Sequence, residues 1–330
     1  MRIGLTYDLR DDYRGMGLSE EALAEFDSPE TVAAIEGVLR GLGHETDRIG
    51  HVRHLAARLV KGDTWGLVFN IAEGLEGRSR EAQVPALLEA YGIPYVFSDP
   101  LTLAVTLDKA VAKRLVRDAG IPTTPFALIE SDDDVAAARA LPFPVFIKPL
   151  AEGTGKGCTT ASKVTSPAAL AEAARALRGR FNQPVIAEPY LSGREFTVGV
   201  VGNGNRARVI AVLEVLLGAN ADPGVYSFDN KELCDSRVSY RLADDAEARA
   251  AADSALAAYK TLGCRDASRL DFRSDGNGVP HFMEVNALAG LHPTHSDLPI
   301  LSTMAGLAYE DLIGQIMEAA TARYGLVGSA

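Results

Sequence analysis

The fold prediction rests on two segments, Arg269-Leu-Asp-Phe272 and Met283-Glu-Val-Asn286, which pattern as neighbouring apolar strands. Glu284 and Asn286 are two residues apart, so on a strand they point to one face, and Val285 between them points into the core. Magnesium prefers oxygen ligands, especially when phosphate completes its shell. The segments offer three such ligands: Asp271, Glu284 and Asn286. The alternative is a charged strand edge without a ligand.

The composition is that of an ordinary soluble globular protein. The chain has 330 residues, enough for two or three domains, and 47% of them are hydrophobic. Its net charge is -11 at pH 7, and there is no block of Lys and Arg, which argues against nucleic acid or an anionic membrane as principal partner. No apolar run reaches about 18 residues, so no membrane span is expected.

The cysteines and the amino terminus favour a cytoplasmic protein. Cys158, Cys234 and Cys264 are odd in number and show no C-x-x-C spacing, so neither a disulfide framework nor a thiolate metal site is expected. The segment from Met1 to Tyr7 patterns as a strand that runs directly into acidic residues, without the apolar core of a signal peptide.

The first hundred residues predict a parallel α/β sheet, because short apolar strands alternate with helical patterns there. The expected elements are strands 3–7, 65–71 and 94–97 and helices 29–40, 51–61 and 81–91. The first helix begins at Asp27-Ser-Pro-Glu30, a typical N-cap sequence. The acidic stretch between Asp8 and Phe26 is predicted to be a mobile loop that can act as a lid.

The remaining residues predict two α+β lobes. The first contains one helix over 101–119, strands 124–129, 144–148 and 158–163, and a helix over 167–178. The second has strands 185–188, 195–201 and 208–216 with little helix between them, which indicates an antiparallel sheet. A helix over 244–262 and the two strands quoted above complete it. We therefore expect domains 1–100, 101–184 and 185–330.

A glycine-rich loop follows the strand that ends at Lys148. Its sequence is Phe146-Ile-Lys-Pro-Leu-Ala-Glu-Gly-Thr-Gly-Lys-Gly157. Glycine tolerates positive φ, so backbone N–H groups can wrap around phosphate oxygens. The alternative is a flexible hairpin tip, but a lysine at the end of an apolar strand favours a phosphate ligand. Lys109 is less specific, because a lysine on an amphipathic helix usually faces solvent.

Taken in order, these motifs resemble those of the ATP-grasp superfamily and, within it, the D-alanine–D-alanine ligase family. The matching segments are Tyr91-Gly-Ile-Pro-Tyr-Val96, Leu107-Asp-Lys109 with Gly120-Ile-Pro122, Pro144-Val-Phe-Ile-Lys-Pro149 with the glycine-rich loop, Ala187-Glu-Pro-Tyr-Leu-Ser-Gly-Arg-Glu-Phe196, and the strands that end at Asn286. The resemblance covers most of the chain. It implies an ATP-grasp fold, in which an N-terminal parallel α/β domain precedes two α+β lobes that clamp ATP.

The resemblance also implies a role for individual residues. The phosphates of ATP would be held by Lys109, Lys148, Lys231 and the loop glycines Gly153, Gly155 and Gly157. The adenine and ribose would be held by Glu188, the backbone around Pro189 to Leu191, and Glu195. Two Mg²⁺ ions, with Mn²⁺ as a substitute, would be held by Asp271, Glu284 and Asn286. Arg269 would bind the reacting acyl phosphate.

The substrate side departs from the family pattern. Glu30 is the candidate for the family's amine-binding glutamate, although it can equally be part of a helix cap. Thr154 stands where the ligases have a serine, and Glu232 replaces a tyrosine. Ser296 is expected to keep a carboxylate-binding role, although a gapless count puts His295 there.

Two further groups of residues are expected near the substrate side. His292 and His295 are expected at the rim of the site rather than as a zinc pair, because Pro293 separates them. A first-substrate pocket built from Glu73, Glu76, Arg78 and Glu81 is conceivable, but a solvated loop is favoured.

The resemblance implies an ATP-dependent, ADP-forming carboxylate–amine ligase that makes a dipeptide or related amide through an acyl phosphate. Its partners would be an amino acid or other carboxylate, an amine, and a second copy in a homodimer. One alternative is an ATP-grasp enzyme of other acyl-phosphate chemistry, which should lack the Arg-x-Asp pattern. Another is a non-catalytic nucleotide-binding regulator, which should have lost a metal ligand or lysine. The sequence leaves the acid, the amine and their chirality open.

Overall fold

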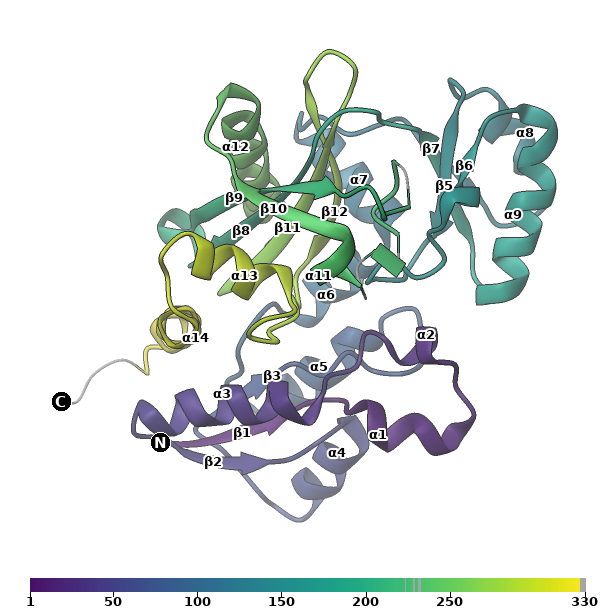
Figure 1. Cartoon of the computed structure of the whole chain (residues 1–330). Coiled ribbons are helices and arrows are strands. Elements are labelled where there is room, and N and C mark those ends of the chain that lie inside the picture. Colours follow the sequence, from purple (N-terminus) through teal and green to yellow (C-terminus); the bar gives the residue numbers. More distant parts are fainter. Residues whose placement is uncertain (223, 228, 231–232, 327–330) are drawn as a thin grey trace.

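The chain forms three β-sheets that surround a common centre (Figure 1). The computed structural model describes residues 1–222, 224–227, 229–230 and 233–326. A parallel sheet is followed along the chain by two antiparallel sheets. The sequence predicts the first and the third of these sheets, and the strand directions of the middle sheet come from the structure. Lys231 and Glu232, to which the resemblance gives roles at the site, lie outside the described residues.

The first sheet has the order β2-β1-β3 and is covered on both faces. Its strands are β1 (Arg2–Thr6), β2 (Glu45–Arg48) and β3 (Leu67–Asn70), and its helices are α3 (Pro29–Gly41), α4 (Val52–Val60) and α5 (Gln83–Ala90). Leu67 and Phe69 pack in one core cluster with α3, whereas Val68 packs in another with α4 and α5. This alternation follows the two-residue period of a strand. The strand expected over 94–97 is wrong, because only Tyr95 bridges to Val68.

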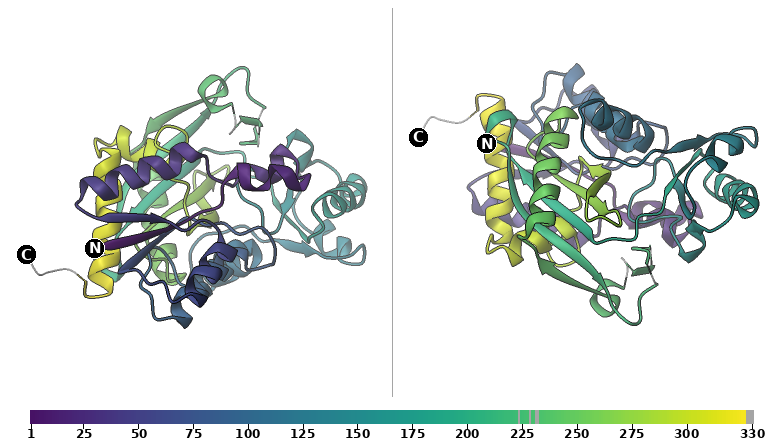
Figure 2. Two further views of the ribbon diagram at one scale, coloured as in Figure 1. Left: turned by 90° about the horizontal axis from the view of Figure 1, so that it is seen from below. Right: turned by 90° about the horizontal axis from the view of Figure 1, so that it is seen from above.

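The stretch predicted to be a mobile loop contains three short helices. They are α1 (Arg10–Tyr13), the 3₁₀ helix η1 (Arg14–Met16) and α2 (Glu20–Leu23). Leu9 bridges to Asp27 at the base, and Tyr13, Leu23 and Phe26 form a small core of their own. We call residues 9–27 the N-terminal segment. Both views of Figure 2 show this purple segment beside the teal central lobe.

The single helix expected over 101–119 is wrong, because the structure has two: α6 (Pro100–Leu107) and α7 (Lys109–Asp118). Asp108 leaves the helical conformation, with φ -84° and ψ 97°. Its carboxylate accepts hydrogen bonds from the N–H groups of Ala110 and Val111, at 3.1 and 3.0 Å. An aspartate that caps the second helix therefore breaks the predicted one.

The second sheet has the order β4-β7-β5-β6. Its strands are β4 (Ala127–Ile129), β5 (Val145–Pro149), β6 (Lys163–Val164) and β7 (Val185–Pro189), and it packs against α8 (Val135–Arg139) and α9 (Pro167–Phe181). The strand expected over 158–163 is wrong, because the 3₁₀ helix η3 (Thr160–Ser162) occupies half of it and β6 begins only at Lys163. The grouping of β7 with the third sheet is also wrong, since β7 pairs with β4 and β5. We propose that the boundary expected at residue 184 lies after β7.

The third sheet is antiparallel, as predicted, with the order β10-β9-β8-β11-β12. Its strands are β8 (Glu195–Val201), β9 (Arg208–Leu217), β10 (Val238–Leu242), β11 (Ala267–Ser274) and β12 (Pro280–Asn286). Its helices are α12 (Ala246–Thr261), which packs on one face, and α13 (Asp297–Met304) and α14 (Tyr309–Arg323), which pack on the other (Figure 1). The short helices η2 (Arg80–Ala82), η4 (Gly204–Arg206) and α11 (Cys234–Arg237) lie in connections.

Candidate active site

Two cavities meet where the three sheets approach one another. The larger has a volume of about 530 Å³ and lies between the N-terminal segment, the glycine-rich loop and the end of β12. The smaller has a volume of about 100 Å³ and lies between the second and third sheets. Among the described residues, both are lined by Lys109, Glu152, Tyr226 and Glu284. A group held in one cavity can therefore reach a group held in the other.

The predicted magnesium ligands come together. Asp271 lies directly opposite Glu284 in the β11–β12 ladder, and the amide nitrogen of Asn286 is 3.4 Å from a carboxylate oxygen of Asp271. Val285 is 5% exposed and points into the core, as expected. In the described part of the chain no group of three or more His, Cys, Asp or Glu side chains is arranged to hold a metal ion. Two carboxylates and one amide oxygen remain a donor set that suits Mg²⁺ completed by phosphate.

Two lysines converge on the same place. The Lys109 and Lys148 ammonium groups are 3.4 and 3.5 Å from the Glu284 carboxylate. Lys109 is buried and also donates to the Glu152 carbonyl oxygen at 2.5 Å. The alternative of a solvent-facing Lys109 is wrong, because the break at Asp108 makes Lys109 the first residue of α7 and it lines both cavities.

Glu188 is fully buried in a network of cations. Its carboxylate is 2.8 Å from the Lys113 ammonium group and 3.4 Å from that of Lys148, and it accepts from the Thr124 hydroxyl at 2.8 Å. Burial would raise the Glu188 pKa, but Lys113 and Lys148 lower it to about 2. Its Oε1 atom has no hydrogen-bond donor among the described residues, although Glu188 lines the smaller cavity. Such an atom suits a ligand amino group.

Lys113 is a site residue that was not predicted from the sequence. A usable signal was its spacing of four residues from Lys109, which puts both lysines on one side of a helix. The other residues expected around a base and ribose, Pro189, Leu191 and Glu195, line the smaller cavity with Phe272 and Arg273. The Glu195 carboxylate is 3.4 Å from the Arg273 guanidinium group.

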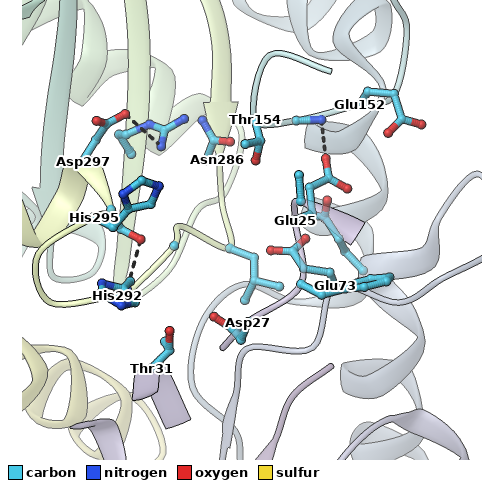
Figure 3. Close-up of a pocket in the computed structure, with 18 of the residues that line it drawn as sticks. Glu25, Asp27, Thr31, Glu73, Glu152, Thr154, Asn286, His292, His295 and Asp297 are labelled. Carbon is cyan, nitrogen blue, oxygen red and sulfur yellow. Dashed lines mark hydrogen bonds and ion pairs between the residues drawn. The ribbon is translucent and has the colours of Figure 1, made fainter. Parts of the chain in front are cut away.

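Arg269 faces the larger cavity. Its guanidinium group donates to the Asp271 carboxylate at 3.1 Å and lies 3.4 Å from the Asp297 carboxylate. Ser296 precedes α13, and its hydroxyl accepts from the His292 N–H group at 3.0 Å. Figure 3 shows His292, His295 and Asp297 on the side of the cavity opposite Glu25, Glu73 and Glu152.

A hydroxyl network lies beside Arg269. The Tyr226 and Tyr240 hydroxyls are 2.9 Å apart, and the Tyr240 hydroxyl donates to Asp297 at 3.3 Å. Tyr226 lines both cavities, which the sequence analysis did not anticipate. This places phenol groups in the site although residue 232 is not a tyrosine.

The glycine-rich loop has positive φ values at two of its three glycines. Gly155 and Gly157 have φ values of 70° and 74°, and a Cβ on Gly157 would come within 2.7 Å of Pro149. Thr154 has φ 51° and lines the larger cavity with Gly153. Lys156 is turned toward the N-terminal segment, where it pairs with Glu25 at 2.9 Å.

The wall formed by the N-terminal region is acidic. Asp27, Glu73 and Glu81 line the larger cavity, and no ion pair to them forms with any described cation. Burial, reinforced by Asp8, raises the pKa of Asp27 to about 8, and burial raises the pKa of Glu81 to about 7. The solvated loop favoured for Glu73 and Glu81 is therefore wrong.

The other acidic and basic residues predicted near this wall lie further out. Glu76, Arg78 and Glu30 are exposed. Arg78 pairs with Asp108 at 2.5 Å. Glu30 is at the cavity mouth in the first turn of α3, where a hydrogen bond with Ser28 lowers its pKa.

Comparison with known proteins agrees with this arrangement. Residues 115–318 match the family model described as the C-terminus of D-Ala–D-Ala ligase. The chain is 33% identical to the D-alanine–D-alanine ligase of Moorella thermoacetica over 87% of this chain and 92% of that protein. It is 35% identical to an uncharacterized protein of Sinorhizobium fredii over 88% and 87% of the two chains.

Solved structures show the same fold. The crystal structure of the D-alanine–D-alanine ligase of Bacillus anthracis complexed with ATP superposes with a TM-score of 0.73, at 21% identity and 99% coverage of this chain and 100% of that one. The VanG D-Ala:D-Ser ligase of Enterococcus faecalis gives a TM-score of 0.73 at 21% identity, with 97% and 99% covered.

The fold and the paired cavities define an ATP-grasp enzyme, a class that uses ATP and Mg²⁺. Within that class, the chain belongs to the D-alanine–D-alanine ligase family and is an ATP-dependent, ADP-forming ligase of carbon–nitrogen bonds. Its substrates are small molecules. Among the helices that the structure describes, none has the length and apolar character to cross a membrane.

Proposed function

We propose that the protein joins the carboxylate of an amino acid to an amine through an acyl phosphate, giving a dipeptide or related amide. The observation that carries this proposal is the meeting of the two cavities at Lys109 and Glu284. The smaller cavity takes ATP and the larger takes the acid and the amine. The γ-phosphate then lies where a carboxylate can reach it.

The smaller cavity suits ATP. The Glu188 Oε1 atom has no hydrogen-bond donor among the described residues beyond its ion pair with Lys148, so it can accept from the adenine amino group. Glu195 lines the same cavity and can accept from the ribose hydroxyls. Lys109 and Lys148 supply positive charge at the phosphates. Asp271, Glu284 and Asn286 would hold two magnesium ions, which would neutralise charge on the transferred phosphoryl oxygens.

The reaction runs in two balanced steps. A substrate carboxylate oxygen attacks the γ-phosphorus and ADP leaves, which forms the acyl phosphate. The amine nitrogen then attacks the acyl carbon, loses a proton, and the tetrahedral adduct expels phosphate. Arg269 faces the larger cavity with fixed, forked donors, which suits the oxyanion of that adduct better than a point charge.

The walls of the larger cavity indicate how substrates are oriented. Asp27 and Glu73 have raised pKa values because they are buried without an ion-pair partner among the described residues. An ammonium group bound on the N-terminal side would lower these pKa values and pair with the carboxylates. Thr154 and Ser296 offer hydroxyls on the other sides, and Glu30 offers a carboxylate at the mouth. We propose that Asp27, rather than the exposed Glu30 alone, receives the ammonium group of the first amino acid. D-Alanine is a natural first candidate, because relatives are named as ligases of it.

The decisive test is a screen for ADP release by purified protein with Mg²⁺ and ATP over pairs of D- and L-amino acids, followed by product masses. We expect at least one pair to release one ADP for each amide formed. If the protein binds ATP but no acid and amine pair stimulates ADP release, the ligase proposal is wrong.

We further propose a cytoplasmic homodimer. The support is the family resemblance together with the absence of a disulfide pattern in the sequence. Sedimentation at micromolar concentration should give a mass near twice that of the chain, and a single-chain mass would contradict the dimer.

A further inference from the structure

The glycine-rich loop is held by carboxylates of the N-terminal segment. The Gly153 N–H group donates to Glu25 Oε1, and the Gly157 N–H group donates to Glu21 Oε1 at 3.0 Å. These partners are 128 and 136 residues apart in the sequence. Glu21 also pairs with Arg180, at the end of α9. The segment therefore contacts the loop at both ends.

Glu25 is enclosed at this contact. Its side chain is 9% exposed, and its Oε2 atom is 2.9 Å from the Lys156 ammonium group and 3.0 Å from the Arg80 guanidinium group. Burial would raise the Glu25 pKa, but Lys156 and Arg80 lower it to about 2, so the carboxylate is charged at neutral pH. A Cβ on Gly153 would come within 2.7 Å of Glu25 Oε1, so a larger residue at this position would displace the Glu25 carboxylate.

The N-terminal segment holds Glu25 in place. The Arg10 guanidinium group donates to the carbonyl oxygens of Phe26 and Ala24, at 2.9 and 3.0 Å. Tyr13, Leu23 and Phe26 pack together beneath it. Ordered side chains inside the segment thus fix the backbone on both sides of Glu25.

The loop forms a partition between the cavities. Gly153 and Thr154 line the larger one, whereas Gly155 and Lys156 line the smaller one. Glu25 lies on the larger side, as Figure 3 shows. The contact of Glu25 with Gly153, on the larger side, can therefore fix the position of Gly155 and Lys156 at the smaller cavity.

We infer that Glu25 is a positioning residue, which holds the glycine-rich loop closed between ATP and the substrates and ties loop closure to the N-terminal segment. The inference rests on the proposed function, because it takes this loop to cover the phosphates. Glu25 acts through Gly153 and Lys156. Loss of its charge frees the loop, which weakens ATP binding and admits water to the phosphoryl group.

The first test measures the loop directly, without any substrate. Amide hydrogen exchange over residues 150–158 should be about tenfold faster in Glu25→Gln, because Gln turns an amide donor toward Lys156 and Arg80 and loses a charge-assisted bond. Glu20→Gln is the matched control, since Glu20 is an exposed glutamate of the same N-terminal segment. The control should exchange like the unmodified protein.

The second test measures the reaction. Glu25→Gln should raise the KM for ATP, and the variant enzyme should release about ten times more ADP per amide than the control. A purely structural role would lower the amount of folded enzyme but leave the KM for ATP and the ratio of ADP to amide unchanged. Unchanged exchange and unchanged coupling in folded Glu25→Gln would overturn the inference.

A variant that does not fold and a protein that ligates no substrates would each leave a different question. If Glu25→Gln does not fold, Glu21→Gln replaces it: faster exchange at Gly157 supports the inference, and unchanged exchange overturns it. If the unmodified protein ligates no pair of substrates, the proposed function fails, while the exchange measurement still decides whether Glu25 holds the loop.

Discussion

Arg269 and Arg273 lie on the same strand, β11, but face different cavities. Arg269 lines the larger cavity near Asp297, and Arg273 lines the smaller one near Glu195. We therefore expect Arg269 to stabilise the transition state and Arg273 to contribute to nucleotide binding.

We expect Arg269→Ala to lower kcat by about 100- to 1,000-fold, the usual effect of removing one donor to a developing oxyanion. The Kd for ATP should stay within a few-fold, because Arg269 acts after ATP is bound. Arg273→Ala should instead weaken ATP. Steady-state kinetics and calorimetry separate the two effects, and a large loss of ATP affinity in Arg269→Ala would refute its assignment.

Asp27 should make the unliganded protein less stable at alkaline pH. Its pKa is about 8 in the folded chain against an ordinary value of 3.8. Between these values the folded state holds a proton that the unfolded state has released, so the free energy of unfolding falls as pH rises through this window. Above pH 8 the carboxylate is charged in both states and the loss is complete.

Asp27→Asn cannot ionise and should not show this loss. From pH 5 to pH 8.5 we expect the unmodified protein to lose about 1–3 kcal/mol relative to the variant, the cost of leaving a buried polar group unpaired. Urea denaturation at several pH values measures it, with Glu30→Gln as the exposed control. Parallel pH profiles for Asp27→Asn and the unmodified protein would contradict the prediction.

At the scale of elements, the junction between α6 and α7 orients the phosphate-binding lysine. Asp99 caps α6 through the Thr102 N–H group at 2.8 Å, and Asp108 caps α7. Each aspartate also pairs with an arginine at 2.5 Å, so the two caps are closely matched. Only Asp108 lies next to Lys109.

Asp108→Ala and Asp99→Ala should each lower the free energy of unfolding by about 1 kcal/mol, the usual cost of a lost cap. Asp108→Ala should also raise the Kd for ATP about tenfold, because Lys109 loses its fixed direction and with it a charge-assisted contact. Denaturation and nucleotide titration of both variants check this. Equal ATP affinity in the two variants would show that the break does not orient Lys109.

The elements also show where sequence patterns succeed. Residues on β11 and β12 alternate between core and site, so the grouping of Asp271 and Glu284 follows from a two-residue period. The break at Asp108 does not follow from periodicity, because the apolar pattern continues through it. Capping by a side chain overrides helix propensity at that single position.

At the scale of the whole molecule, ATP should stabilise the fold by bridging the second and third sheets. At 100 times the Kd, a ligand that binds only the folded state adds about 2.7 kcal/mol. We expect Mg²⁺ with ATP to produce this gain in chemical denaturation. EDTA should remove most of it, since Lys109 and Lys148 alone would then face the phosphates. An equal gain with ATP and EDTA would argue against the magnesium assignment.

The three sheets also explain which parts of the site could not be predicted. Lys113, Glu25 and Asp27 belong to the site only because distant segments pack together. Lys113 appears in the sequence as one charge among several on a helix, and its pairing with Glu188 joins residues from α7 and β7. The spacing from Lys109 indicates on which side of the helix Lys113 lies, but no local pattern indicates that its partner is Glu188.

The sequence by itself determined the parallel sheet of the first domain, the antiparallel sheet that carries Asp271 and Glu284, and the glycine-rich loop, since periodicity and glycine placement are local properties. Only the tertiary structure decided that Lys109 points into the site, that Glu73 and Glu81 form an acidic wall, and that Glu25 holds Gly153. The physical reason is that a buried charged group pairs with groups that the folded chain brings next to it, whatever their distance in sequence. Glu25 and Gly153 are 128 residues apart.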